Sequence, residues 1–175
     1  MGKNTGGERM AERERSCCFT GHRAAKLPWG DNEQDARCLE LKRRIADAVE
    51  AVYGSGVRHF ICGMANGCDM YFGEAVLELR ARRPEVTLEA AVPFEEQAGR
   101  WEEPLRRRYA RLLESCDYYT LVSREYAPGC YQRRNRYMVD ASGVLIAAYD
   151  GRPGGTMATM LYALRRGLEI IEIPV

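Results

Sequence analysis

This sequence of 175 residues lacks several features that mark particular protein classes. It has no run of about 18 or more apolar residues, so we expect no transmembrane helix. No apolar stretch follows the charged N-terminal residues, so we expect no secretory signal and a cytoplasmic location. The formal net charge is only +1, so no global field attracts nucleic acid or membranes. Internal repeats and low-complexity segments are also missing.

Metal-binding patterns are scarce as well. There are two histidines, and the seven cysteines contain no C-x-x-C pair. We therefore expect no metal site, and we predict no cofactor. The cysteines are interpreted as small buried thiols in a reducing compartment.

What the chain does contain is an alternation of strand-like and helix-like segments. Apolar strand candidates occur at 17–20, 57–62, 87–92, 118–122, 143–149 and 168–175, and segments of helical periodicity lie between them. This order predicts a Rossmann-like, doubly wound α/β domain with a mostly parallel sheet and helices on both faces. We expect one domain over residues 16–175 and a disordered tail over residues 1–15.

Unusual loops follow four of the predicted strands. They are Gly21-His22-Arg23, Gly63–Asp69, Ser123–Gln132 leading to Arg134, and Gly151–Thr156. Ligands of parallel α/β sheets bind outside the carboxyl ends of the strands. We therefore expect these loops to meet at one edge of the sheet and form a shared site.

Two of these loops are rich in glycine and precede a helix. Gly154, Gly155 and Thr156 suit a phosphate, because backbone N–H groups and a hydroxyl converge at a helix N-terminus; the alternative is a plain turn with a threonine cap. In Gly63-x-x-x-Gly67-x-Asp69 the glycines allow positive φ or close approach of a ligand. Asp69 either binds a ribose hydroxyl or caps the helix.

Charged and aromatic residues complete the candidate site. Arg134 and Asn135, together with Gly21 and Arg23, can contact a phosphate or carboxylate, or else Arg134 belongs to a solvated helix start. His22 is either a general acid/base or a hydrogen-bonded loop histidine. Tyr126, Tyr131 and Trp101 can stack on a base or pack in the core. Arg106–Arg108 and Arg165–Arg166 are the only indication of nucleic acid.

The ordered set of motifs resembles the SLOG superfamily, and most closely its small YpsA/YoqJ-like branch of unknown function. The resemblance rests on T-G-H-R (Thr20–Arg23), G-x-x-x-G-x-D (Gly63–Asp69), R-N-R-Y-M-V-D (Arg134–Asp140) and G-G-T (Gly154–Thr156). It extends from about Cys18 to Val175. It implies a Rossmann-like domain that binds or senses a nucleotide-derived phosphorylated ligand, and we expect a homodimer.

Two better-known branches offer alternative functions. Resemblance to the Smf-like DNA-processing-A proteins, through Cys62–Asp69 and Arg134–Arg136, implies binding of single-stranded DNA. Resemblance to the LOG enzymes, through Arg134, Met138 and Pro153–Gly155, implies hydrolysis of the N-glycosidic bond of nucleoside 5′-monophosphates. Their G-G-x-G-T-x-x-E pattern is broken here, and no acid follows Thr156 on the helix. Asp69 and Glu74 remain as carboxylates, and we favour a binding module over an enzyme.

Overall fold

The computed structural model describes residues 12–175. The elements in chain order are β1 (Ser16–Thr20), η1 (Ala24–Lys26), α2 (Ala36–Gly54), β2 (His59–Cys62), α3 (Cys68–Arg82), β3 (Thr87–Val92), α4 (Glu103–Glu114), β4 (Tyr118–Leu121), α5 (Cys130–Asp140), β5 (Val144–Tyr149), α6 (Gly155–Arg165) and β6 (Glu169–Pro174). Most of the tail predicted at 1–15 lies outside the described residues. Within the described part, the Arg15 carbonyl accepts the backbone N–H groups of Arg58 and His59.

The six strands form one parallel sheet in the order β4-β3-β2-β1-β5-β6. Successive strands are added on one side of β1 as far as β4, and the chain then returns through α5 to place β5 on the other side of β1. The predicted Rossmann-like α/β fold is confirmed. The order of the strands reverses between β1 and β5, which is where sheets of this type open a crevice.

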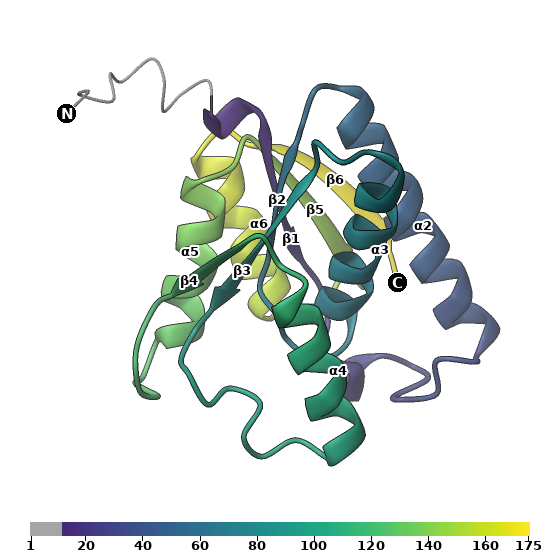
Figure 1. The fold of residues 1–175 in the computed structure, drawn as a ribbon, viewed down its shortest axis with the longest axis vertical. Helices are drawn as coiled ribbons and strands as arrows, with labels where there is room; N and C mark the ends of the chain where they lie inside the picture. The colour runs from purple at the N-terminus through teal and green to yellow at the C-terminus, as the bar shows by residue number, and fades with distance from the viewer. Residues whose placement is uncertain (1–11) are drawn as a thin grey trace.

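Helices cover the two faces of the sheet unequally. Figure 1 shows α2 and α3 on one face and α5 and α6 on the other, with α4 beside α3. The helix α2 begins after Asp35, whose carboxylate accepts the backbone N–H of Arg37, and its apolar residues recur at helical spacing and are buried (Leu41, Ile45, Val49, Val52). The apolar side of α2 thereby packs into the core beside the sheet.

One helix start differs from the sequence interpretation. The Arg-Asn-Arg cluster was expected to open a helix, but α5 begins one turn earlier, at Cys130, after Gly129 with φ of 81°. Arg134 therefore lies in the second turn and is buried, with Cys130 and Met138 on the same face. The idea of a solvated helix start is wrong for Arg134, because the spacing of four residues directs it toward the sheet.

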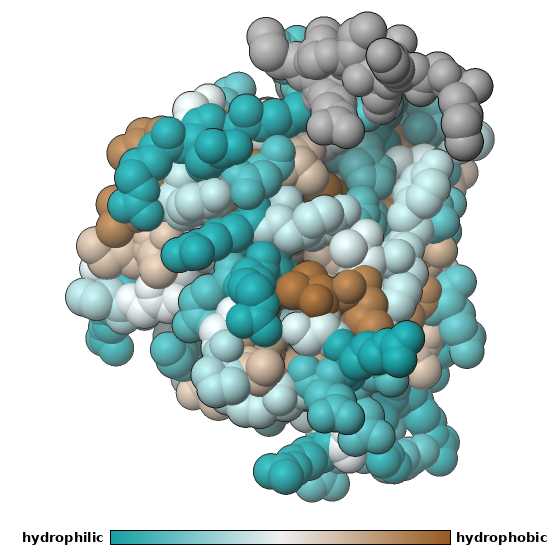
Figure 2. All heavy atoms as spheres, turned by 90° about the vertical axis from the view of Figure 1, so that its left-hand side faces the viewer, coloured by the Kyte–Doolittle hydropathy of each residue, from teal (hydrophilic) through white to brown (hydrophobic). Residues whose placement is uncertain are grey.

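The outer surface shows no broad apolar area on the side drawn in Figure 2, where hydrophobic atoms form small separate patches among hydrophilic ones. No helix within residues 12–175 is long and apolar enough to cross a membrane.

Candidate functional site at the carboxyl edge of the sheet

The four loops singled out in the sequence approach one another at the carboxyl edge of the sheet, at the lower end of the molecule in Figure 1. A cavity of about 280 Å³ opens there. It is lined by Phe19, Thr20, Gly21, His22, Arg23, Lys26, Ala65, Asp69, Tyr131, Arg134, Asn135, Met138, Gly155 and Thr156. These residues come from the end of β1, from the segments after β1, β2 and β5, and from α3, α5 and α6, so the cavity lies at the reversal of strand order.

The N-terminus of α6 forms one wall of this cavity. Gly155 and Thr156 open the helix after Gly154, and no side chain caps it. The first backbone N–H groups of a helix lack partners inside the helix and attract anions. Lys26 adds positive charge, because its Nζ lies 3.8 Å from where a Cβ on Gly154 would be. Sequence reasoning missed Lys26, whose position depends on the short η1 turn after β1.

The segment between β2 and α3 is held by close backbone contacts. A Cβ on Gly67 would lie 2.5 Å from the backbone nitrogen of Ala24 and 2.8 Å from the carbonyl oxygen of His22. Gly67 also has φ of 100°, a conformation that favours glycine. The Cys68 N–H donates to the His22 carbonyl at 3.1 Å. The start of α3 is therefore fastened directly to the loop after β1.

Arg134 and Asp69 place opposite charges at the base of the cavity. Both are buried, and both lie against Gly63, where a Cβ would be 2.5 Å from Nη1 of Arg134 and 2.7 Å from Oδ2 of Asp69. Nη1 donates to the Gly63 carbonyl, and Oδ2 accepts the Ala65 N–H at 3.0 Å. Burial raises the pKa of Asp69 while Arg134 opposes that rise. Burial likewise lowers the pKa of Arg134 while Asp69 opposes that fall.

Asn135 joins this pair to α6. Its Oδ1 accepts from Nε of Arg134 at 2.8 Å, and its Nδ2 donates to Oγ1 of Thr159 at 3.0 Å. Thr159 in turn donates to the Gly155 carbonyl at 2.9 Å. The orientation of Arg134 is thus coupled to the first turn of α6.

Two further titratable groups, His22 and Cys68, lie in or beside the cavity. His22 is 8% exposed, and its Nε2 lies 3.0 Å from Oδ1 of Asp150 at the end of β5. A backbone hydrogen bond from Arg152, with His22 adding to it, lowers the pKa of Asp150.

Burial raises the pKa of Cys68 to about 12. Cys68 therefore remains a neutral thiol despite its place at a helix N-terminus, which argues against thiolate chemistry.

Of the ten residues predicted for the site, seven line the cavity (Gly21, Arg23, Asp69, Arg134, Asn135, Gly155, Thr156) and three do not (Gly63, Gly67, Gly154). Those three glycines shape the backbone that surrounds the cavity. Glu74, considered as a further carboxylate of the crevice, is not among the lining residues. Both of its oxygens accept from Arg108, at 2.6 and 2.7 Å.

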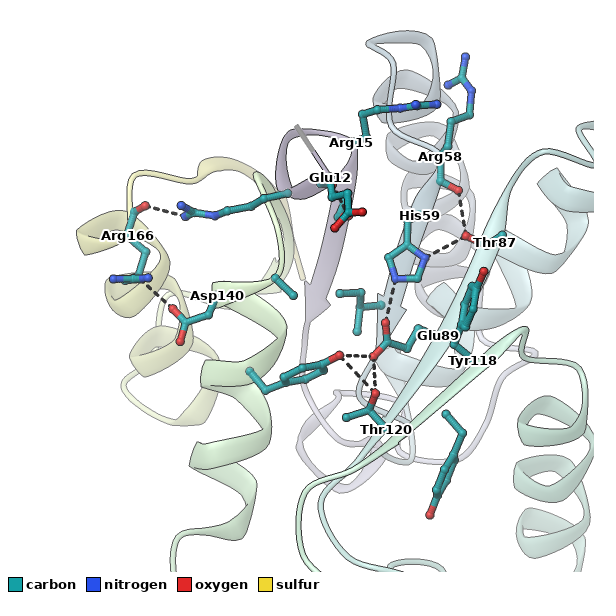
Figure 3. Close-up of a pocket in the computed structure, with 16 residues that line it drawn as sticks. Glu12, Arg15, Arg58, His59, Thr87, Glu89, Tyr118, Thr120, Asp140 and Arg166 are labelled. Atoms are coloured by element: carbon teal, nitrogen blue, oxygen red, sulfur yellow. Dashed lines mark hydrogen bonds and ion pairs between the residues drawn. The ribbon is translucent and has the colours of Figure 1, made fainter. Parts of the chain in front are cut away.

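A larger cavity of about 1170 Å³ lies away from this site, beside the strand starts and the part of the sheet that α5 leaves uncovered (Figure 3). Glu89 is at its centre and is 6% exposed. The carboxylate accepts from His59 Nε2 at 2.8 Å, from Thr120 at 2.8 Å and from the Tyr137 hydroxyl at 2.5 Å. Figure 3 shows the side chains of His59 and Thr120 pointing toward Glu89.

This second cluster ties α5 to three strands. The other His59 nitrogen, Nδ1, lies 2.9 Å from Oγ1 of Thr87, so both ring nitrogens are engaged. Burial alone would raise the pKa of Glu89, but hydrogen bonds from His59, Tyr137 and Thr120 outweigh it and lower the pKa. A network with every central group paired is typical of structural support for a sheet face.

Comparison with known proteins identifies a family whose model matches most of this chain. The family model described as the YspA SLOG family matches residues 17–169. The YpsA protein of Bacillus subtilis is 28% identical over 146 residues, covering 82% of this chain and 80% of its own length. The SPbeta prophage-derived protein YoqJ of the same organism is 30% identical over 138 residues, covering 71% and 81%.

Solved structures show the same fold at much lower identity. DNA processing protein A (DprA) from Streptococcus pneumoniae superposes with a TM-score of 0.62 at 14% identity, over 93% of this chain and 51% of its own. DprA from Helicobacter pylori, in a structure described as giving insight into its single-stranded DNA binding mode, superposes with a TM-score of 0.62 at 14% identity, over 96% of this chain and 68% of its own. This chain therefore spans about half the length of the first of these proteins.

Proposed function

This chain belongs to the YspA SLOG family, and from that premise we propose that its carboxyl-edge cavity binds or senses a phosphorylated ligand derived from a nucleotide. The observation that carries the proposal is one cavity holding an uncapped helix N-terminus and three cationic side chains, from Arg23, Lys26 and Arg134. Phosphate groups favour that combination of backbone N–H donors and positive charge. The free thiols suit a reducing compartment such as the cytoplasm.

The phosphate is best accommodated at the start of α6. Gly155 and Thr156 supply backbone N–H groups and a hydroxyl, and the exposed Lys26 supplies an ammonium nearby. Arg134 is held from below by the Gly63 carbonyl and by Asn135. Such a pre-positioned guanidinium loses little side-chain entropy when a ligand arrives.

The carboxylates in and near the cavity favour a binding role over a catalytic one. The helix that follows Thr156 bears no acid, and Glu74 is engaged by Arg108. Asp69 is the lining carboxylate, but its Oδ2 accepts the Ala65 N–H, and burial raises its pKa. If the protein were instead a LOG-like phosphoribohydrolase, Asp69 would have to stabilise the oxocarbenium-like centre of the reaction.

Single-stranded DNA binding is the second alternative, suggested by the likeness to DprA. Four of the five arginines that indicated nucleic acid are paired with acids: Arg106 and Arg107 with Glu103, Arg108 with Glu33 and Glu74, and Arg166 with Asp140. Together with a formal net charge of +1, this leaves little of the phosphate-neutralising surface that a nucleic acid strand requires.

The proposal is tested by thermal denaturation with a panel of nucleoside monophosphates, sugar phosphates and inorganic phosphate, followed by calorimetry on the compounds that stabilise. A ligand at 100 times its Kd should stabilise the fold by about 2.7 kcal/mol. Lys26→Ala removes an exposed cation beside Gly154 and should weaken binding by about 1.5–3 kcal/mol. Arg165→Ala, at the opposite end of α6, is the matched control and should bind like the wild type.

Three results would oppose this function. If no phosphate compound stabilises the protein, the cavity is not a phosphate site. If only oligonucleotides do so, the DNA-binding alternative replaces it. If a nucleoside monophosphate releases its free base on incubation, and Asp69→Asn abolishes that release, the protein is a phosphoribohydrolase.

A further inference from the structure

Three aromatic rings cluster beside the carboxyl-edge cavity, and one of them, Tyr131, lines it. Phe94 follows β3, Tyr126 lies in the loop after β4, and Tyr131 is in the first turn of α5. Phe94 meets Tyr126 edge-on with ring centroids 5.5 Å apart, and it meets Tyr131 at 5.9 Å. The two tyrosine rings are 6.5 Å apart. We call these three residues the aromatic platform.

The platform is continuous with the cavity and open to solvent. Tyr131 lines the cavity, and the Arg23 guanidinium lies 4.7 Å from the centre of its ring. Tyr126 is 64% exposed. A large ring exposed to this extent adds little to the core, and the planar Arg23 guanidinium over Tyr131 provides a second flat surface.

The small cavity volume limits what can enter it. At about 280 Å³ it lies just below the range of roughly 300–1,000 Å³ that is usual for small-molecule sites. A phosphate and its sugar would fill most of that space. Any aromatic base attached to the sugar would then extend to the rim, where the platform and Arg23 lie.

We propose that the aromatic platform, with Arg23, stacks against the base of a nucleoside monophosphate whose phosphate is bound at the N-terminus of α6. This assignment rests on the proposed function and narrows its ligand from nucleotide-derived phosphorylated compounds in general to nucleoside monophosphates. Rings and a guanidinium stack on any base. Purine monophosphates therefore bind more tightly than pyrimidine monophosphates, because they offer the larger stacking face.

A longer nucleic acid strand fits these observations less well. Successive bases along a strand need a basic groove that follows several phosphates. Beyond the cavity, the clustered arginines at 106–108 are paired with acids. A mononucleotide needs only one phosphate position and one stacking surface, and the rim and cavity supply one of each.

Calorimetry with AMP and with ribose 5-phosphate separates the two halves of the site. Wild-type protein should bind AMP about 5- to 150-fold more tightly than ribose 5-phosphate, the range expected for one stacked base. Tyr126→Leu keeps an apolar side chain but removes the ring. It should weaken the binding of AMP, leave the binding of ribose 5-phosphate unchanged, and so remove most of the difference between the two affinities. Tyr118→Leu replaces a tyrosine that is similarly exposed, at 57%, and should bind both compounds like the wild type.

The outcomes distinguish this inference from the function on which it rests. Equal affinities for AMP and ribose 5-phosphate, unchanged by Tyr126→Leu, would overturn the platform and leave the phosphate site intact. Binding of neither compound would remove the proposed function itself. If a thymidine oligonucleotide binds far more tightly than any mononucleotide and Tyr126→Leu weakens it, the platform serves a strand and the mononucleotide assignment is wrong.

Discussion

At the scale of single residues, the sequence predicted the position of Gly63 but not the full reason why a glycine is needed there. The sequence indicated a glycine turn there, and glycine freedom was one expected reason. Gly63 is not among the glycines of positive φ within residues 12–175. Its lack of a side chain matters instead because Arg134 and Asp69 lie within 2.5 and 2.7 Å of the position a Cβ would take. That contact joins residues far apart in the chain, so no local pattern contains it.

Glu89 gives a prediction at the same scale. Its folded-state pKa is lowered by the hydrogen bonds from His59, Tyr137 and Thr120, so the ionised form stabilises the fold. That stabilisation is complete above the ordinary carboxyl pKa of about 4.3 and is lost as the pH falls through the lowered value. Glu89→Gln should reduce the free energy of unfolding at pH 7 by about 1.5–3 kcal/mol.

The measurement is urea denaturation of wild type and variant at pH 7 and near pH 3. The difference between them should shrink at the lower pH. Glu40→Gln, which removes an exposed carboxylate on α2, should change stability little at either pH. A full-sized difference that persists at pH 3 would show that the charge of Glu89 is not what stabilises the network.

At the scale of elements, the sequence predicted the strands and helices well because their signals are local. The boundaries of β1, β3, β4, β5 and β6 lie within one residue of the expected ones. The start of α5 was missed because Gly129 and Cys130 carry a weak signal beside the charged cluster that follows. The buried spacing Cys130, Arg134, Met138 was the available clue, since it puts an arginine on the apolar face of the helix.

The contact between α5 and α6 gives a prediction at this scale. Asn135→Ala removes the hydrogen bond to Thr159 and leaves Nε of the buried Arg134 without its amide partner. We expect the free energy of unfolding to fall by about 1–3 kcal/mol, the cost of an unsatisfied buried polar group. Affinity for the phosphate ligand should fall too, because Arg134 and the first turn of α6 are no longer held together.

A double-mutant cycle with Thr159→Val checks the coupling by chemical denaturation. The two substitutions break the same bond, so the double variant should lose less stability than the two single variants added together. Thr159→Ser keeps the hydroxyl and should retain most of the stability. Strictly additive losses would mean that Asn135 does not act through Thr159.

At the scale of the whole molecule, alternation of strands and helices was sufficient to predict a parallel α/β sheet whose unusual loops meet at its carboxyl edge. It did not specify the order of the strands, which depends on α5 carrying the chain back from β4 to β5. Nor did it indicate that the sheet would end in two unlike edges. The edge at β6 has exposed Glu169, Glu172 and Pro174, residues that discourage pairing with another strand.

The opposite edge, β4, lacks such protection and carries the last prediction. Tyr118 and Tyr119 are 57% and 50% exposed, and neither charge nor proline interrupts Tyr118–Leu121. A second copy could pair with this strand about a two-fold axis, giving the homodimer expected from the sequence. Tyr119→Lys should convert a dimer into a monomer in light scattering, because a lysine on an edge strand opposes pairing. Leu164→Lys makes a similar change at an apolar residue that is 65% exposed on α6, and it should leave the dimer intact. A wild-type monomer, or equal dissociation by both substitutions, would rule out β4 as the dimer contact.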